Sequence, residues 1–134
     1  MSTLSIRREL VKIAAQDVGQ VEASRNQGAA IKKFWPCTSY PEGYANREPY
    51  CAAAVCYWIC QWLKLPGVQS ALGKTAAQLE AWRCKSAAAF GWLDWAKKKG
   101  VRVLSDSPSE VLHTGDIVVF DFSHIGILEG DHND

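Results

Sequence analysis

Two segments far apart in the chain carry the residue types of a thiol nucleophile and its base. Cys51 stands at the expected start of an apolar helix, and His124 stands at the start of an expected strand far downstream. The thiolate is the reactive form of cysteine, and a free cysteine with a pKa near ~8.5 is mostly thiol at neutral pH. Unsatisfied N–H groups in the first turn of a helix stabilise a thiolate, and a nearby histidine can take its proton. The two segments therefore predict a Cys51–His124 pair that attacks a carbonyl carbon.

The residues that follow Cys51 have small side chains, and the residues that follow His124 alternate between the two faces of the expected strand. Three alanines, residues 52–54, follow Cys51 and would let substrate approach this end of the helix. The backbone N–H of Cys51 is itself a natural oxyanion donor. Strand alternation places His124 on the same face as Gly126 and opposite Ile125, so Gly126 would leave open space beside the imidazole.

Helix-period hydrophobic patterns fill the first three quarters of the chain. Helices are expected over residues 3–18, over a short segment that ends at Pro36, and over residues 50–64, 75–84 and 90–99. The helix over residues 50–64 is apolar nearly all round, which is typical of a central buried helix. Leu65-Pro66-Gly67 is expected to terminate it, and the basic run at residues 97–99 suits the last turn of a helix. The side chains expected to face inward are Leu4, Val11, Ala14, Ala15 and Val18 in the first helix, Ile31, Phe34 and Trp35 in the second, and in part Trp92, Leu93 and Trp95.

After Gly100 the pattern changes to the period of strands. Strands are expected over residues 101–104, 116–122 and 124–129, separated by loops. Helices come first and strands last, so we expect an α+β fold with a small antiparallel sheet packed on the central helix. A chain of 134 residues without repeats indicates one domain over residues 1–134.

The two segments together resemble a known family of hydrolases. Tyr50-Cys51-Ala52-Ala53-Ala54-Val55, then residues 115–120 (Gly-Asp-Ile-Val-Val-Phe), then residues 124–127 (His-Ile-Gly-Ile) are similar to the motifs of the cysteine, histidine-dependent amidohydrolase/peptidase (CHAP) family and of the related NlpC-like peptidases. The resemblance implies a papain-like fold that cleaves amide bonds in peptidoglycan. It assigns Cys51 as the nucleophile, His124 as the general base and then acid, and Tyr50 as a residue that lines the substrate cleft in place of the usual tryptophan. Ala54 replaces the usual aromatic residue, so the local packing must differ.

The third catalytic group of this family has no clear counterpart here. The family orients its histidine with a polar residue on a strand that follows the histidine strand, and this sequence ends at Asp134. Glu129 would lie roughly 16 Å from His124 along an extended strand, which is too far. Asp131, Asn133 and Asp134 are equally awkward. The sheet is therefore expected to be shortened, with another residue in the role or with weak turnover.

Five cysteines, an odd number, leave at least one thiol unpaired. Cys56 and Cys60 are four residues apart on the central helix and are expected to be small buried side chains. The sequence leaves the disulfide state of Cys37, Cys56, Cys60 and Cys84 open, including a Cys37–Cys84 bridge. A metal site or cofactor is not expected, because there is no C-x-x-C pair and His113, His124 and His132 lack ligand spacing.

The overall composition excludes several classes of function. A net charge of +1, from 15 basic and 14 acidic residues, gives no electrostatic reason for binding nucleic acid. No run of 18 apolar residues exists, so membrane insertion is not expected. Residues 1–20 alternate charged and apolar side chains, which is unlike a secretory signal peptide. We expect a protein made in the cytoplasm that acts at the cell wall or periplasm after lysis or after export by a route that reads no cleavable signal.

Three hypotheses of function remain open from the sequence. The first is a peptidoglycan hydrolase, either an N-acetylmuramoyl-L-alanine amidase or an endopeptidase of the stem or cross-bridge, as in a bacteriolytic phage enzyme or an exported effector. Its partners would be peptidoglycan, a holin or export machinery, and an immunity or inhibitor protein. The second is a catalytically weak domain that binds the cell wall. The third is a cysteine peptidase that acts on other amides.

Overall fold

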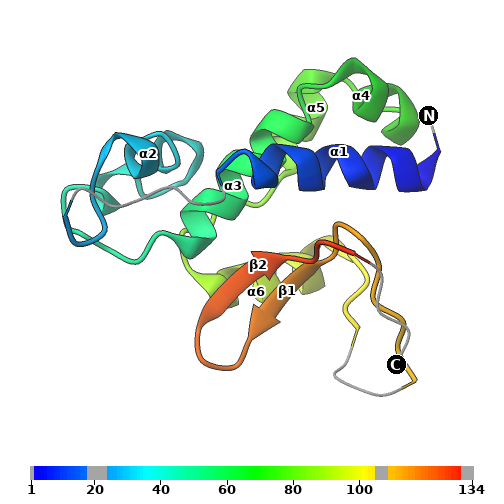
Figure 1. The fold of residues 1–134 in the computed structure, drawn as a ribbon. Coiled ribbons are helices and arrows are strands. Elements are labelled where there is room, and N and C mark those ends of the chain that lie inside the picture. The colour runs from blue at the N-terminus through cyan, green and yellow to red at the C-terminus, as the bar shows by residue number, and fades with distance from the viewer. Residues whose placement is uncertain (1, 18–23, 105–108, 131–134) are drawn as a thin grey trace.

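The computed structural model describes residues 2–17, 24–104 and 109–130. The elements follow in the order α1 (Thr3–Ala15), α2 (Ala29–Lys32), the 3₁₀ turns η1 (Trp35–Cys37) and η2 (Pro41–Gly43), α3 (Cys51–Trp62), α4 (Pro66–Leu72), α5 (Ala76–Trp82), α6 (Ala89–Lys99), β1 (Ile117–Phe120) and β2 (His124–Ile127). Figure 1 shows α1, α3, α4 and α5 above a β-hairpin formed by β1 and β2, and α6 behind the hairpin. This mixture of helices with a small antiparallel sheet agrees with the expected α+β class.

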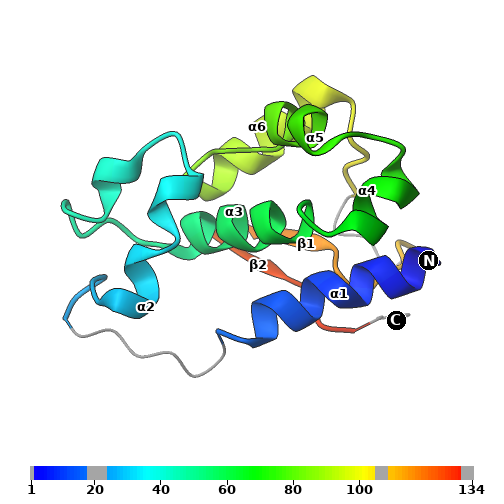
Figure 2. The same cartoon turned by 90° about the horizontal axis from the view of Figure 1, so that it is seen from above.

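Helix α3 is the centre of the domain, as the sequence predicts. Seven of its residues are buried, namely Ala52, Ala53, Ala54, Val55, Cys56, Ile59 and Cys60. All of them except Cys60 belong to two core clusters, because one side of α3 faces α1 and the hairpin and another side faces η1. A helix can bury residues around its axis only when other elements cover it on several sides. Figure 2 shows α3 running between α1 and the pair α5 and α6.

Helix α1 begins where the sequence predicts, with Ser2 as its N-cap, but it buries a different face from the expected one. The Ser2 hydroxyl accepts a hydrogen bond from Ser5 N at 3.1 Å. The buried side chains are Ile6 and Leu10, one turn apart, whereas Leu4 is 40% exposed. The expected inner face that included Leu4 and Val11 was therefore wrong. The α3 residue Trp62 fixes the rotation of α1, because its Nε1 donates to Ile6 O at 2.7 Å.

The expected ends of the first two helices also need correction. Helix α1 ends at Ala15, and Val18 lies outside the described residues. Helix α2 ends at Lys32, before Pro36, which lies inside η1. The side chains expected to be buried there, Ile31, Phe34 and Trp35, are buried in the second core cluster, so the apolar pattern was correct although the helix is shorter.

Helix α4 was not predicted from the sequence, and a strand was predicted over residues 101–104 that the structure lacks. Pro66 begins α4 instead of only ending the preceding helix, since proline suits the first position of a helix. Residues 101–104 form no strand, and Val101 and Val103 are exposed. Among the described residues, β1 pairs with β2 alone, so no strand gives residues 101–104 a hydrogen-bonding partner.

Helices α5 and α6 begin and α6 ends close to the expected residues, whereas α3 ends at Trp62 and α5 at Trp82, each two residues earlier than expected. Thr75 forms a capping box with Gln78 at the start of α5, and Gly100 ends α6 in the left-handed conformation with a φ of 72°. The lysines at residues 97–99 occupy the last turn of α6. In the described part of the chain, no helix has the length and hydrophobicity to span a bilayer.

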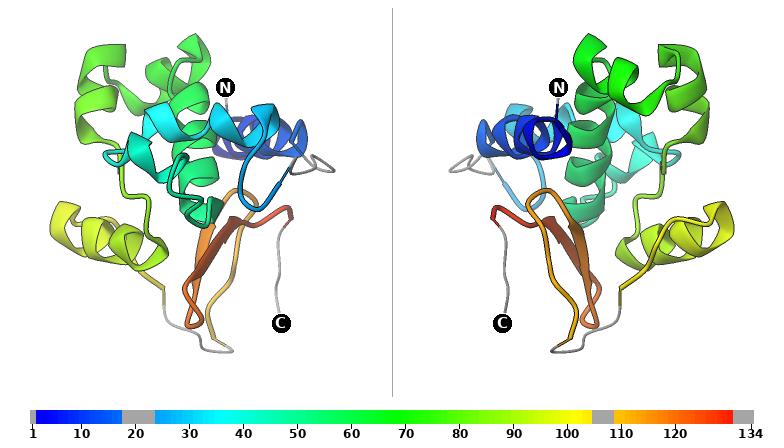
Figure 3. Two further views of the ribbon diagram at one scale, coloured as in Figure 1. Left: turned by 90° about the vertical axis from the view of Figure 1, so that its left-hand side faces the viewer. Right: turned by 90° about the vertical axis from the view of Figure 1, so that its right-hand side faces the viewer.

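The hairpin packs one face on the helices. Strands β1 and β2 are antiparallel, with Ile117 opposite Ile127 and Phe120 opposite His124. The side chains directed at the core are Ile117, Val119, Ile125 and Ile127. Strand β2 contacts α3, and β1 contacts α6. Figure 3 shows the hairpin below the helices, with α6 to one side of it.

Candidate functional site

Cys51 is the first residue of α3 and is partly exposed. The first helical hydrogen bond runs from Ala54 N to Tyr50 O at 2.8 Å, so the N–H groups of residues 51–53 have no acceptor within the helix. Among the described residues, no side chain caps this end. The Cys51 thiol therefore lies at the positive end of the helix dipole, beside backbone N–H groups without helical acceptors.

Tyr50 anchors the start of this helix. Its ring stacks on that of Phe34, with the centroids 6.2 Å apart and the planes 27° apart. Both rings belong to the second core cluster, in which Tyr50 is partly buried. The stacking fixes the direction in which the chain enters α3, and so it also positions Cys51.

His124 is the first residue of β2 and lies on the exposed face of the hairpin. Its neighbour Ile125 is 2% exposed and faces α3, so strand alternation directs His124 to the other side. The imidazole stacks with Phe120 (centroids 5.7 Å apart) and with Phe122 (6.0 Å apart, planes 7° apart). A Cβ atom added at Gly126 would meet nothing within 4 Å, which is open space of the kind expected beside the imidazole.

The structure brings the Cys51 and His124 segments together without joining their side chains. Helix α3 contacts β2, and Figures 1 and 2 both show the N-terminal end of α3 toward the start of β2. Within the described ranges, the hydrogen bonds of the chain include none between Cys51 Sγ and the His124 imidazole. The backbone segments that carry Cys51 and His124 are thus neighbours, as expected, but the His124 ring stacks on aromatic rings on the outer face of the hairpin.

The aspartate of the Gly115-Asp116 motif has a structural role. Asp116 Oδ1 accepts from Arg7 Nη1 at 2.8 Å, and Oδ2 accepts from His113 N at 2.8 Å. Arg7 Nη1 also donates to Thr114 O at 3.1 Å. These contacts join α1 to the turn that leads into β1. Sequence reasoning missed Arg7, because a charged residue on an amphipathic helix gives no sign of its distant partner.

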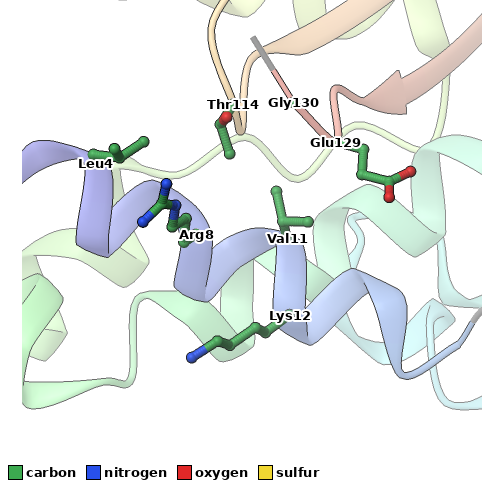
Figure 4. A pocket seen from close by; sticks show the side chains of 7 residues that line it. All are labelled: Leu4, Arg8, Val11, Lys12, Thr114, Glu129 and Gly130. Carbon is green, nitrogen blue, oxygen red and sulfur yellow. The ribbon is translucent and has the colours of Figure 1, made fainter.

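Of the residues considered for the third catalytic role, only Glu129 belongs to the described part of the chain, and no hydrogen bond joins it to His124 there. Glu129 is exposed and lines a cavity of ≈ 480 Å³ between α1 and the segment after β2, together with Arg8 and Lys12 (Figure 4). Asp131, Asn133 and Asp134 lie outside the described residues. A second cavity of ≈ 230 Å³ is lined by Asp17, Lys33 and Tyr57, among others. Neither cavity is lined by Cys51, Tyr50 or His124.

The other four cysteines are free thiols. Cys56, Cys60 and Cys84 are buried, as expected for the two on α3, and Cys37 is partly exposed. Burial raises the pKa of Cys37 to about 11 and that of Cys56 to about 12, so both are protonated at neutral pH. In the described part of the chain, no group of three or more His, Cys, Asp or Glu residues is arranged to hold a metal ion.

Comparison of the chain with models of known protein families, with curated proteins and with solved structures gave no match.

Proposed function

We propose that the protein is a cysteine hydrolase that cleaves an amide bond of peptidoglycan, with Cys51 as nucleophile and His124 as general base and then acid. The observation that carries the proposal is the position of Cys51 at the open N-terminus of a buried helix that packs on the strand beginning with His124. The resemblance of these segments to the CHAP and NlpC-like motifs supports peptidoglycan as the substrate and a papain-like relation between helix and sheet.

The reaction would proceed through a thioester. His124 takes the proton of the Cys51 thiol, and Sγ attacks the carbonyl carbon of the amide. The N–H of Cys51 is available to bind the oxyanion, because the first turn of α3 leaves it without a helical acceptor. His124 then donates the proton to the leaving amine, and water hydrolyses the thioester with His124 again acting as base.

This mechanism requires the His124 ring to leave its stack with Phe120 and Phe122. The imidazole is exposed, so leaving the stack breaks no core contact. Strand alternation directs the ring away from α3, so the start of β2 must also turn for the imidazole to reach Cys51. An aromatic pair of this kind contributes about 0.5–1.5 kcal/mol, which the binding of substrate can offset. Tyr50, one residue before the nucleophile, is then placed to contact the substrate.

Digestion of purified peptidoglycan tests the proposal. We expect the full chain to release soluble fragments, Cys51→Ala to release none, and Cys56→Ala to resemble the unaltered protein. Cys56 is a suitable control because it lies on the same helix but is fully buried. Mass spectrometry of the fragments separates an amidase, which frees the amino group of L-alanine, from an endopeptidase. Equal fragment release by the unaltered protein and Cys51→Ala, including no release by either, would exclude the mechanism.

A catalytically weak domain that binds the cell wall is the second candidate. It is favoured by the stacking of His124 on the outer face of the hairpin and away from Cys51. Co-sedimentation with sacculi without release of fragments would support it. Cleavage of a peptide made only of L-amino acids would instead favour a peptidase that acts on other amides.

A further inference from the structure

Four cysteines that the proposed mechanism does not use gather beside α3. Cys56 and Cys60 are one turn apart on that helix, Cys37 ends η1, and Cys84 follows α5. Each of Cys37, Cys60 and Cys84 lies close enough to Cys56 to interact electrostatically with it. Four neighbouring thiols offer several disulfide pairings, and the polar contacts around them distinguish these pairings.

The Glu80–Arg83 ion pair places Cys37 beside Cys60. Arg83 donates from Nε to Glu80 Oε1 at 2.8 Å and from Nη1 to Cys37 O at 2.7 Å. The Cys60 thiol contacts the same Glu80 oxygen, with its sulfur 3.8 Å away. The contacts of Arg83 and Glu80 therefore bring the Cys37 backbone and the Cys60 thiol to the same ion pair, and η1 itself contacts α3. In agreement, burial and then the neighbouring Cys60 thiol raise the pKa of Cys37.

Cys56 and Cys84 are placed differently. The Cys56 thiol donates to Ser86 O at 3.3 Å and lies 3.7 Å from Cys84 O, and its side chain is fully buried. Of the four cysteines, only Cys37 is partly exposed. An external oxidant can therefore reach Cys37 first, and Cys60 is the partner placed to react next.

We propose that Cys37 and Cys60 form a disulfide when the protein meets an oxidising environment. The bridge would fasten η1 to α3 and close a loop that contains Tyr50 and Cys51, without using the Cys51 thiol. The cross-link would thus hold the segment that leads into the N-terminus of α3. It does not depend on Cys51 being a nucleophile, so it can be tested apart from the hydrolase. In Cys51→Ala no glutathione can add at that position, so this variant gives the mass change of the bridge alone.

The oxidant is a small-molecule or protein disulfide, and the reaction is thiol–disulfide exchange. The Cys37 thiol gives up its proton, attacks one sulfur of the external disulfide and releases the other as a thiol. The Cys60 thiol then gives up its proton and attacks the Cys37 sulfur in the mixed disulfide, which expels the second thiol. One external disulfide is reduced to two thiols, and two protein thiols are oxidised to one disulfide. Because burial holds the pKa of Cys37 at about 11, the rate should rise with pH between neutrality and that value.

The experiment treats the reduced full-length chain with oxidised glutathione and blocks the remaining thiols with iodoacetamide. We expect the mass before blocking to fall by about 2 Da and the melting temperature to rise by roughly 5–15 °C. Trypsin leaves Cys37 in residues 34–47 and Cys84 in residues 84–85, whereas residues 48–64 hold Cys51, Cys56 and Cys60. The expected product is a cross-link between residues 34–47 and 48–64, which dithiothreitol reverses.

Variants identify the cysteine within residues 48–64. Cys37→Ser and Cys60→Ser should both lose the cross-link, whereas Cys51→Ala and Cys56→Ala should keep it. A retained cross-link in Cys60→Ser, a link from residues 34–47 to 84–85, or no cross-link in excess oxidised glutathione would each overturn the proposal. Circular dichroism of each reduced variant confirms that it is folded. Because Cys51→Ala is expected to be inactive on peptidoglycan yet still form the bridge, failure of one proposal is separable from failure of the other.

Discussion

Arg7 Nη1 lies 2.8 Å from Asp116 Oδ1, in an ion pair that joins the first helix to the turn before the hairpin. The side chains are 35% and 21% exposed, so Coulomb attraction alone contributes little. His113 N also donates a hydrogen bond to Asp116 Oδ2, so both oxygens of this carboxylate accept hydrogen bonds within the turn or from α1. The hairpin that carries His124 is thus held to the helices by a polar contact as well as by its apolar face.

Replacing Asp116 should loosen this connection. We expect Asp116→Ala to lower the free energy of unfolding by about 1–3 kcal/mol, because Arg7 and His113 N both lose an acceptor. Urea denaturation followed by tryptophan fluorescence measures this change. Arg8→Ala is the control, since Arg8 is exposed on the same helix and should change stability by less than about 0.5 kcal/mol. An Asp116→Ala effect no larger than that of the control would show that the apolar face alone holds the hairpin.

Gly43 is required by the packing of Trp35. A Cβ atom at Gly43 would overlap the indole ring, whose Cη2 atom would lie only 2.7 Å away. Trp35 is 1% exposed, and in the described part of the chain its Nε1 has no hydrogen-bond partner, so packing alone holds the ring. We expect Gly43→Ala to cost about 1–3 kcal/mol by overpacking. In thermal denaturation, Gly126→Ala should change little because its Cβ would enter open space; equal melting temperatures for the two variants would contradict this account.

Arg83 should be sensitive even to a conservative change. Its side chain is 5% exposed and bonds Cys37 O and Glu80 Oε1 with separate nitrogen atoms. Lysine offers a single nitrogen, so either Cys37 O or Glu80 Oε1 would lose its partner, and we expect Arg83→Lys to cost about 1–3 kcal/mol. Arg102→Lys is the matched control, because Arg102 is 83% exposed. Denaturation curves that coincide for the two variants would show that the two separate nitrogen donors of the Arg83 guanidinium are not needed for stability.

Alkaline pH should destabilise the fold through its buried thiols. The pKa of Cys56 rises from 9.0 to about 12 on burial, so the folded state favours the protonated thiol. This stabilisation is complete below pH 9.0 and is lost as the pH rises toward about 12, at up to ~1.4 kcal/mol per pH unit. Cys56→Ala should therefore lose less stability than the unaltered protein between pH 9 and 10.5. Parallel pH curves for the two proteins, measured by urea denaturation, would refute this role for Cys56.

If the hydrolase proposal holds, Phe122 should restrain the reaction. Phe122 is 70% exposed and stacks on His124, so its removal frees the imidazole at no cost to the core. We expect Phe122→Ala to raise the rate of peptidoglycan hydrolysis about 2–10-fold, which corresponds to the energy of one aromatic pair. Val103→Ala, a change at another exposed apolar residue, serves as the control. A lower rate in Phe122→Ala would mean that the stack holds His124 in its working position.

Much of the local structure could be predicted from the sequence. The caps at Ser2 and Thr75, the stop at Gly100 and the apolar run that begins at Cys51 each act within a few residues, so the sequence alone determined those helix ends and the helical position of Cys51. The alternation around Ile125 likewise determined that His124 and Gly126 share one face of a strand, whereas the tertiary structure decided that this is the outer face.

Contacts between distant residues decided the rest. The rotation of α1 onto Ile6 and Leu10, the link from Arg7 to Asp116 and the lack of a strand at residues 101–104 depend on which surfaces meet after folding. The stack of His124 on two phenylalanines and the approach of Cys37 to Cys60 have the same origin. Local patterns specify which residues a helix or strand can bury, but only packing of the whole chain selects the partners, because each contact must be compatible with all its neighbours.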